Sequence, residues 1–156
     1  MSLGRTPSQT VGPFYAIGMC RRSDNELVSD GVELSGRLID GQDTPISDGV
    51  VELWDGTRWG RRATDAEGRF SFRVAKPEPP PGEAPRLDAF VFARGLLRHQ
   101  LTRIYFPDEE AANAADPVLA ALPPHDRATL VAQHEDTGLR FDIHMQGDLA
   151  TVFFAH

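Results

Sequence analysis

The side chains with which this chain could build a metal centre are five histidines, two tyrosines and one cysteine. A short-range metal site usually places two histidines on one face of a strand or helix, next to a carboxylate or phenolate. No two histidines here stand two or four positions apart, and Cys20 has no second thiol for a disulfide or zinc site. We therefore expect no metal ion on this chain and a free thiol at Cys20. The other residues concerned are His99, His125, His134, His144, His156, Tyr15 and Tyr105.

Motifs for a nucleophile or a phosphate are also missing. None of the serines lies in a Gly-x-Ser-x-Gly turn, and the glycines form neither the dinucleotide-binding nor the Walker spacing. We therefore expect no catalytic residue in this chain.

Arg94 is the best candidate for a binding residue. It follows the apolar run 90–93 and precedes Gly95. A guanidinium recognises a carboxylate through its planar fork, and a neighbouring glycine lets a ligand or another chain come close. A structural ion pair is an equally good interpretation of Arg94 on these grounds.

Alternating hydrophobicity predicts the elements that position these residues. Val32, Leu34 and Leu38 alternate with polar side chains, as in a strand buried on one face. Further strands, separated by Gly and Asp turns, predict an all-β fold with an antiparallel sandwich or barrel. Helix-forming composition and proline positions predict short helices at 109–115 and 126–134. The expected strands are 32–38, 49–54, 69–74, 87–93, 101–106, 139–146 and 151–154.

Residues 1–25 are expected to form an extended arm, because two prolines and a glycine interrupt any helical or strand period within residues 6–15. Four apolar side chains in this arm need cover, since a solvated arm gains nothing from them. They are Val11, Phe14, Tyr15 and Ile17.

The length of 156 residues suits one domain, expected to span 1–156. The chain has 16 basic and 23 acidic residues, a net charge of −7, so nucleic acids and anionic membranes are poor partners. No stretch approaches the roughly 20 apolar residues that span a bilayer, and no signal segment begins the chain. We expect a cytoplasmic protein.

Several blocks of sequence, in order along the chain, carry a family resemblance. They are TPSQTVGPFY (6–15), FARGLL (92–97), LTRIYF (101–106), ANAADPVL (112–119), RFDI (140–143), QGD (146–148) and TVFF (151–154). Together they resemble the alpha chains of the protocatechuate 3,4-dioxygenase family, which are intradiol ring-cleaving enzymes.

The resemblance implies a β-sandwich of the intradiol dioxygenase type, with strands within 32–106 and 139–154 and short helices at 109–135. It also implies a hetero-oligomer in which only the beta subunit carries a ferric iron, held by two tyrosines and a His-x-His pair. The complex would cleave 3,4-dihydroxybenzoate (protocatechuate) with O2 to 3-carboxy-cis,cis-muconate. This chain would be the iron-free alpha subunit and would need its beta partner for activity.

The same resemblance suggests which residues of this chain reach the substrate. In the family, the Gly-Pro of the alpha-chain arm and the arginine of the Phe-Ala-Arg-Gly segment line the substrate pocket of the beta chain. Carried over, these are Gly12, Pro13 and Arg94, with Thr10 as a weaker neighbour.

The sequence also departs from the family pattern. Residues 86–88 read Arg-Leu-Asp where the His-x-His pair would stand, Pro80 stands near one tyrosine position, and no tyrosine follows Trp54. The segments between Gly18 and Gly31 and between Trp54 and Ala63 are shorter than in typical alpha chains, which leaves the oligomer size open.

A second interpretation belongs to another class of protein. Residues 36–40, 50–54 and 64–70 also resemble transthyretin-like and carboxypeptidase-regulatory domains, which are non-catalytic β-sandwich binding modules. This alternative leaves the arm and the helical region 109–134 unexplained.

Overall fold

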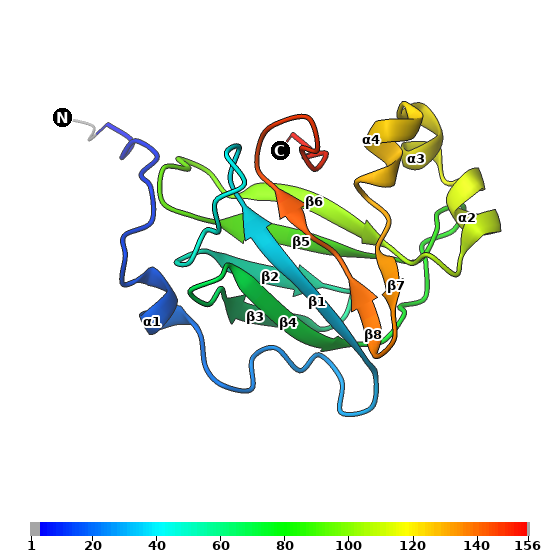
Figure 1. The fold of residues 1–156 in the computed structure, drawn as a ribbon, viewed down its shortest axis with the longest axis horizontal. Helices are drawn as coiled ribbons and strands as arrows, with labels where there is room; N and C mark the ends of the chain where they lie inside the picture. Colours follow the sequence, from blue (N-terminus) through cyan, green and yellow to red (C-terminus); the bar gives the residue numbers. More distant parts are fainter. Residues whose placement is uncertain (1–3, 156) are drawn as a thin grey trace.

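Two packed β-sheets form the body of the protein, with the N-terminal segment at one end and three short helices at the other (Figure 1). This computed structural model describes residues 4–155, so the first three residues of the expected arm and His156 lie outside the described part. The helices are α1 (Tyr15–Met19), α2 (Glu110–Ala115), α3 (Pro117–Ala121) and α4 (Pro124–Ala128). The strands are β1 (Val32–Ile39), β2 (Val50–Trp54), β3 (Trp59–Ala63), β4 (Arg69–Val74), β5 (Arg86–Phe92), β6 (Gln100–Tyr105), β7 (Gln133–Glu135), β8 (Gly138–Arg140) and β9 (Ile143–His144).

The two sheets differ in the direction of their strands. The sheet β3-β2-β5-β6 is antiparallel throughout, with Val51 opposite Val91 and Ala89 opposite Thr102. The other sheet has the order β4-β1-β8-β7, with β9 also on β1, and β1 runs parallel to both β8 and β9. The predicted all-β sandwich is confirmed, and the sheet that contains β1 is mixed rather than purely antiparallel.

Alternate side chains of the strands fill the space between the sheets. Along β5, Leu87, Ala89 and Val91 are fully buried, whereas Asp88 and Phe90 on the other face are partly exposed. Burying a leucine of this kind contributes about 1.5–3 kcal/mol. The same core includes Leu34, Leu38, Leu53, Phe72, Ile104 and Ile143 from the other strands.

The expected strand at 139–146 is divided into β8 and β9, which corrects that prediction. Phe141 donates its N–H to the carbonyl of Ser35 at 2.8 Å. The next N–H group of β1 on this side, that of Arg37, bonds to a side chain instead of a backbone carbonyl. The N–H of Arg37 donates to Oδ1 of Asp142 at 2.9 Å. A carboxylate therefore replaces one backbone carbonyl of the ladder, and the strand is interrupted there.

The short strand β3 was absent from the sequence-based prediction. It pairs with β2 through a tight turn at Asp55, whose carboxylate accepts hydrogen bonds from the N–H groups of Thr57 and Arg58. Gly56 has a φ of +95°, which glycine adopts without strain. Two adjacent arginines break the alternation of β3, so the pattern gave no strand signal.

The helical region beyond β6 is organised by the buried carboxylate of Asp116. Its Oδ1 accepts hydrogen bonds from the N–H groups of Val118 (2.9 Å) and Leu119 (3.1 Å), which caps α3. The predicted helix at 109–115 is present as α2, but the helix predicted at 126–134 ends at Ala128. The carbonyl of Leu130 accepts from the N–H of Tyr105 at 2.9 Å, so the chain leaves the helix to pair with β6.

Residues 151–154, expected to form the last strand, make only an isolated bridge. Phe154 donates its N–H to Leu101 at 2.8 Å, while the carbonyl of Val152 accepts from the hydroxyl of Thr102 at 2.8 Å. Because the Thr102 side chain, rather than a backbone N–H of β6, donates to this carbonyl, the pairing does not extend into a ladder.

Within residues 4–155 every helix is too short to cross a membrane.

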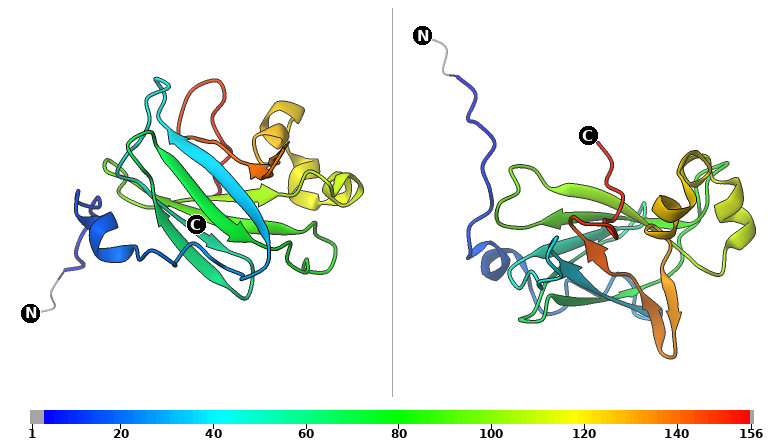
Figure 2. Two further views of the ribbon diagram at one scale, coloured as in Figure 1. Left: turned by 60° about the horizontal axis from the view of Figure 1, so that its bottom comes forward. Right: turned by 45° about the horizontal axis from the view of Figure 1, so that its top comes forward.

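The N-terminal arm is extended as expected up to Val11 and then coils into α1. Tyr15 donates its N–H to the carbonyl of Gly12 at 3.1 Å, and Gly18 donates to Phe14 at 3.2 Å, so this part of the predicted arm is a helical turn. Figure 2 shows the arm running past the loop that joins β5 to β6.

Candidate functional site

A hydrogen bond joins the arm to the loop after β5. The N–H of Gly95 donates to Oγ1 of Thr10 at 2.8 Å, across 85 positions of sequence. Gly95 has a φ of +90°, and the N–H of Leu96 donates to the carbonyl of Ala93 at 3.3 Å, so this loop begins with a tight turn. The contact places Thr10 next to Arg94, two residues that the sequence analysis proposed for one site.

The remaining two predicted residues lie on the exposed part of the arm. Gly12 and Pro13 directly precede α1, and a methyl group on Gly12 would meet no atom of the described chain within 4 Å. Their exposure leaves them accessible to another chain.

Arg94 forms an ion pair with Asp48, which is not among the residues predicted from the sequence. Nε of Arg94 contacts Oδ2 of Asp48, which lies in the loop before β2. The Arg94 side chain is 61% exposed and the Asp48 side chain 24% exposed. The pairing joins two loops far apart in the sequence, and no local pattern around Asp48 signals it.

Part of the apolar surface of the arm is covered by the sandwich of the same chain. The ring of Tyr15 packs against Phe92 with centroids 5.7 Å apart, and burial raises the pKa of the Tyr15 phenol. Val11 and Tyr15 help line a pocket of about 410 Å³. Phe14 and Ile17, in contrast, are 77% and 76% exposed. The expected cover is thus supplied within this chain for Val11 and Tyr15, whereas Phe14 and Ile17 remain exposed.

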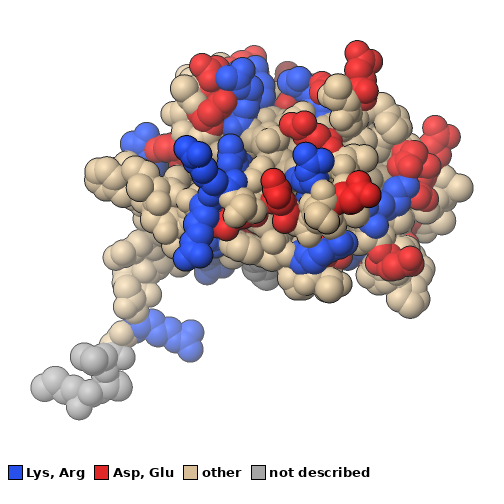
Figure 3. Space-filling model, turned by 90° about the horizontal axis from the view of Figure 1, so that it is seen from below, with Lys and Arg blue, Asp and Glu red and all other residues tan. Residues whose placement is uncertain are grey.

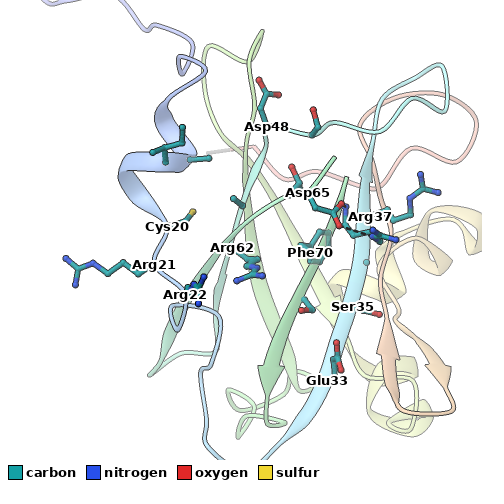
Figure 4. Close-up of a pocket in the computed structure, with 18 of the residues that line it drawn as sticks. Cys20, Arg21, Arg22, Glu33, Ser35, Arg37, Asp48, Arg62, Asp65 and Phe70 are labelled. Atoms are coloured by element: carbon teal, nitrogen blue, oxygen red, sulfur yellow. Dashed lines mark hydrogen bonds and ion pairs between the residues drawn. The ribbon is translucent and has the colours of Figure 1, made fainter. Parts of the chain in front are cut away.

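A larger groove of about 770 Å³ lies between α1 and the strands β1 and β4, and its lining includes Pro13 and Asp48 (Figure 4). Arg21, Arg22 and Arg62 lie on the α1 side of this groove, near Cys20, as Figure 4 shows. These three guanidinium groups form no ion pair with any carboxylate in residues 4–155.

Positive charge therefore concentrates locally on a chain whose net charge is −7. Figure 3 shows a column of Lys and Arg side chains beside the N-terminal segment, whereas charges of both signs alternate over the rest of that face. Cys20 is half-buried and free, and burial raises the pKa of its thiol, which keeps it protonated and weakly nucleophilic at neutral pH. The groove suits anions better than thiol chemistry.

Residues 86–88, where the resemblance would place the His-x-His pair, hold ion pairs. Arg86 pairs with Glu83 and, at 3.5 Å, with Asp88, which also lies 3.6 Å from Nε of Arg103. The part of the chain that the structure describes contains no group of three or more His, Cys, Asp or Glu side chains that could hold a metal ion.

Neither tyrosine is placed as a metal ligand. The hydroxyl of Tyr105 donates to Oδ1 of Asp116 at 3.3 Å, and burial raises the pKa of this phenol above its usual range. A raised pKa disfavours the phenolate, the form that binds iron. With Tyr15 packed on Phe92, residues 4–155 do not fit the ferric site that the resemblance implies for the beta subunit.

Comparison with known proteins gives the family. No protein-family model matches the chain. It is 38% identical, over 193 aligned positions, to the protocatechuate 3,4-dioxygenase alpha chain of Burkholderia cepacia, with 98% of both chains covered. It is 31% identical to the alpha chain of the same enzyme from Pseudomonas putida, covering 97% of this chain and 96% of that one.

The chain belongs to the family of protocatechuate 3,4-dioxygenase alpha chains. Its relatives include the protocatechuate 3,4-dioxygenase beta chain of Burkholderia cepacia, which is 26% identical over 82% of this chain. The alignment to the first alpha chain is longer than the 156 residues of this protein, so that relative contains segments that this chain lacks. This agrees with the shortening expected from the sequence.

Solved structures agree with the fold of this alpha chain. The dioxygenase domain of a carbohydrate-binding fusion protein from Streptomyces sp. SirexAA-E superimposes with a TM-score of 0.58, at 22% identity over 79% of this chain and 87% of that one. Hydroxyquinol 1,2-dioxygenase from Pseudomonas putida gives 0.57 at 20% identity, over 92% of this chain and 67% of that one. These likenesses confirm the predicted intradiol dioxygenase sandwich.

Proposed function

We propose that this protein is the iron-free alpha subunit of a protocatechuate 3,4-dioxygenase. Together with an iron-bearing beta subunit it would cleave 3,4-dihydroxybenzoate between its two hydroxylated carbons. Both atoms of O2 enter the product, 3-carboxy-cis,cis-muconate. The observation that carries the proposal is the match to alpha chains along nearly the whole sequence, including the arm that the competing binding-module interpretation leaves unexplained.

The arm and the loop after β5 would form one wall of the beta subunit's substrate pocket. The Thr10–Gly95 hydrogen bond holds the two segments together on this chain. Gly12 and Pro13 are exposed where a partner chain can reach them, and Pro13 stiffens the arm because its ring fixes φ. Phe14 and Ile17 supply exposed apolar side chains that association with the beta subunit would bury.

Arg94 would bind the carboxylate of the substrate. Its exposed guanidinium is the type of group that recognises carboxylates through two parallel hydrogen bonds. The unpaired arginines of the neighbouring groove favour an anionic substrate in the same region. This chain would thus contribute binding and shape to the pocket.

The ferric iron would be held by the beta subunit, because Arg86 and Asp88, which the resemblance places at the His-x-His strand, form ion pairs on this chain. When bound there, the iron supplies the redox chemistry of ring cleavage. The residues of this chain would take no part in that chemistry.

Co-expression with a protocatechuate 3,4-dioxygenase beta chain from the same organism tests the proposal. We expect the two chains to copurify, to consume O2 with 3,4-dihydroxybenzoate and to place two ¹⁸O atoms in the product when supplied with ¹⁸O2. Each chain alone is the control. A protein that stays separate from the beta chain and leaves its activity unchanged would instead support a β-sandwich binding module.

A further inference from the structure

The two residues of the Asp48–Arg94 ion pair differ in how firmly the fold holds them. Gly49, next to Asp48, donates its N–H to Oγ1 of Thr64 at 3.0 Å, and Thr64 donates its N–H back to the carbonyl of Gly49 at 2.9 Å. Thr64 is buried. Asp48 therefore stands on a fixed part of the sandwich, whereas Arg94 lies on a turn at the surface.

Asp48 makes its closest contact with the guanidinium at Nε. The contact is between Oδ2 and Nε, so it uses the Nε edge of Arg94. Neither Nη group of Arg94 donates a hydrogen bond within residues 4–155. An arginine can bind a carboxylate with two parallel hydrogen bonds from its Nη1 and Nη2 groups. Because neither Nη group donates a hydrogen bond to the described residues, both can donate to a ligand carboxylate.

The carboxylate of Asp48 has Arg94 as its ion-pair partner. Its Oδ2 is buried and accepts no hydrogen bond from the residues that the structure describes. A buried carboxylate oxygen needs a compensating charge, and the Nε of Arg94 is the cation in contact with it. Asp48 thus restrains a long, exposed side chain that would otherwise sample many rotamers.

We propose that Asp48 is a positioning residue that fixes Arg94 with its Nη1 and Nη2 groups directed at the carboxylate of the substrate. This inference rests on the proposed function, because it assumes that Arg94 binds an anionic substrate in the assembled enzyme. Asp48 itself does not touch the substrate in this account.

The test uses the assembled enzyme with Asp48→Asn, which removes the charge and keeps the size of the side chain. Asp108→Asn is the matched control, because Asp108 forms an exposed ion pair with Lys76 rather than with Arg94. We expect Asp48→Asn to raise KM for 3,4-dihydroxybenzoate about two- to fivefold, with kcat unchanged, and Asp48→Glu to restore most of the affinity. The control variant keeps the wild-type KM.

Two further comparisons separate positioning from a general structural role. With the neutral analogue 3,4-dihydroxybenzamide, wild type and Asp48→Asn are expected to bind equally, as measured by competitive inhibition. In an Arg94→Ala background, Asp48→Asn should have no further effect on KM.

An unchanged or lowered KM in Asp48→Asn would overturn the inference while the proposed function stands. Equal losses with the acid and the amide would also overturn it. A wild-type complex that does not consume O2 with 3,4-dihydroxybenzoate would overturn both the proposed function and this inference.

Discussion

The hydroxyl of Thr10 accepts a hydrogen bond from the N–H of Gly95 at 2.8 Å and thereby ties the N-terminal arm to the turn that carries Arg94. Two segments that the family resemblance assigns to one pocket are thus already joined on the isolated chain. The arm does not depend on the beta subunit for its position at this point. Pocket formation on assembly would then require little rearrangement of Thr10 and Arg94.

Replacing Thr10 by valine removes this hydrogen bond and keeps the shape of the side chain. We expect faster amide hydrogen exchange at Gly95 and a KM raised about two- to tenfold, because a hydrogen bond of this kind contributes about 0.5–1.5 kcal/mol. Thr10→Ser keeps the hydroxyl and serves as the control. Unchanged exchange at Gly95 in the valine variant would show that the contact is absent in solution.

Replacing Arg94 by alanine tests its role in substrate binding. The expected result is a KM for 3,4-dihydroxybenzoate about 10- to 100-fold higher, with a smaller change in kcat, because a charged hydrogen bond contributes about 1.5–3 kcal/mol. Arg94→Lys should recover only part of the affinity, since lysine lacks the planar fork. Arg98→Ala, an exposed arginine in the same loop, is the control. A lowered kcat with an unchanged KM would contradict a binding role.

The buried carboxylate of Asp116 should make stability depend on pH. Although burial raises its pKa, hydrogen bonds from the N–H groups of Ala84, Leu119 and Val118 and from the hydroxyl of Tyr105 more than compensate, and the pKa lies below its usual range. The charged form is therefore stabilised by folding. That stabilisation is complete above the pKa of an unfolded aspartate, about 3.9, and is lost as pH falls through the lower folded pKa.

Asp116→Asn should accordingly lower the free energy of unfolding by about 2–4 kcal/mol at pH 7, measured by urea denaturation. The difference from wild type should shrink as the pH falls below about 4. Asp108→Asn, which removes an exposed aspartate with a lowered pKa, should cost much less at any pH. A difference between wild type and Asp116→Asn that stays constant down to pH 2.5 would rule out this origin.

Iron should enter the complex with the beta subunit only. After incubation with iron and desalting, we expect this chain alone to hold no stoichiometric iron and to be colourless, while the complex holds iron. Replacing both Arg86 and Asp88 by alanine should leave the iron content of the complex unchanged, because these positions form ion pairs rather than ligands. Stoichiometric iron on the isolated chain, measured by plasma emission spectroscopy, would contradict this expectation.

The sequence predicted most strands because burial alternates along them. Leu34 and Leu38 face the core as the pattern of β1 requires, and burial alternates in the same way along β4 and β5. The first four residues of β2 are all buried, so its apolar run rather than alternation marked it as a strand. The pattern failed where a side chain replaces a backbone partner, as Asp142 does for Arg37. It failed again at β3, whose paired arginines Arg61 and Arg62 hide the strand period.

The residues of the candidate site came from two kinds of reasoning, since Gly12, Pro13 and Thr10 were predicted through the resemblance alone. Composition and spacing indicated that Arg94 could bind an anion, but a structural ion pair explained it equally well, and the structure contains such a pair. Asp48 was missed because its partner comes from a distant loop, which no local pattern encodes. The proximity of Thr10 to Gly95 likewise depends on how the arm folds back across the sandwich.

The most direct measurement is a structure of the assembled enzyme with 3,4-dihydroxybenzoate bound. The account predicts that the Nη groups of Arg94 lie about 3 Å from the substrate carboxylate, with Asp48 still on the Nε edge and Gly12 and Pro13 at the pocket wall. A substrate enclosed by the beta subunit alone, with Arg94 beyond the reach of any hydrogen bond to it, would contradict the account.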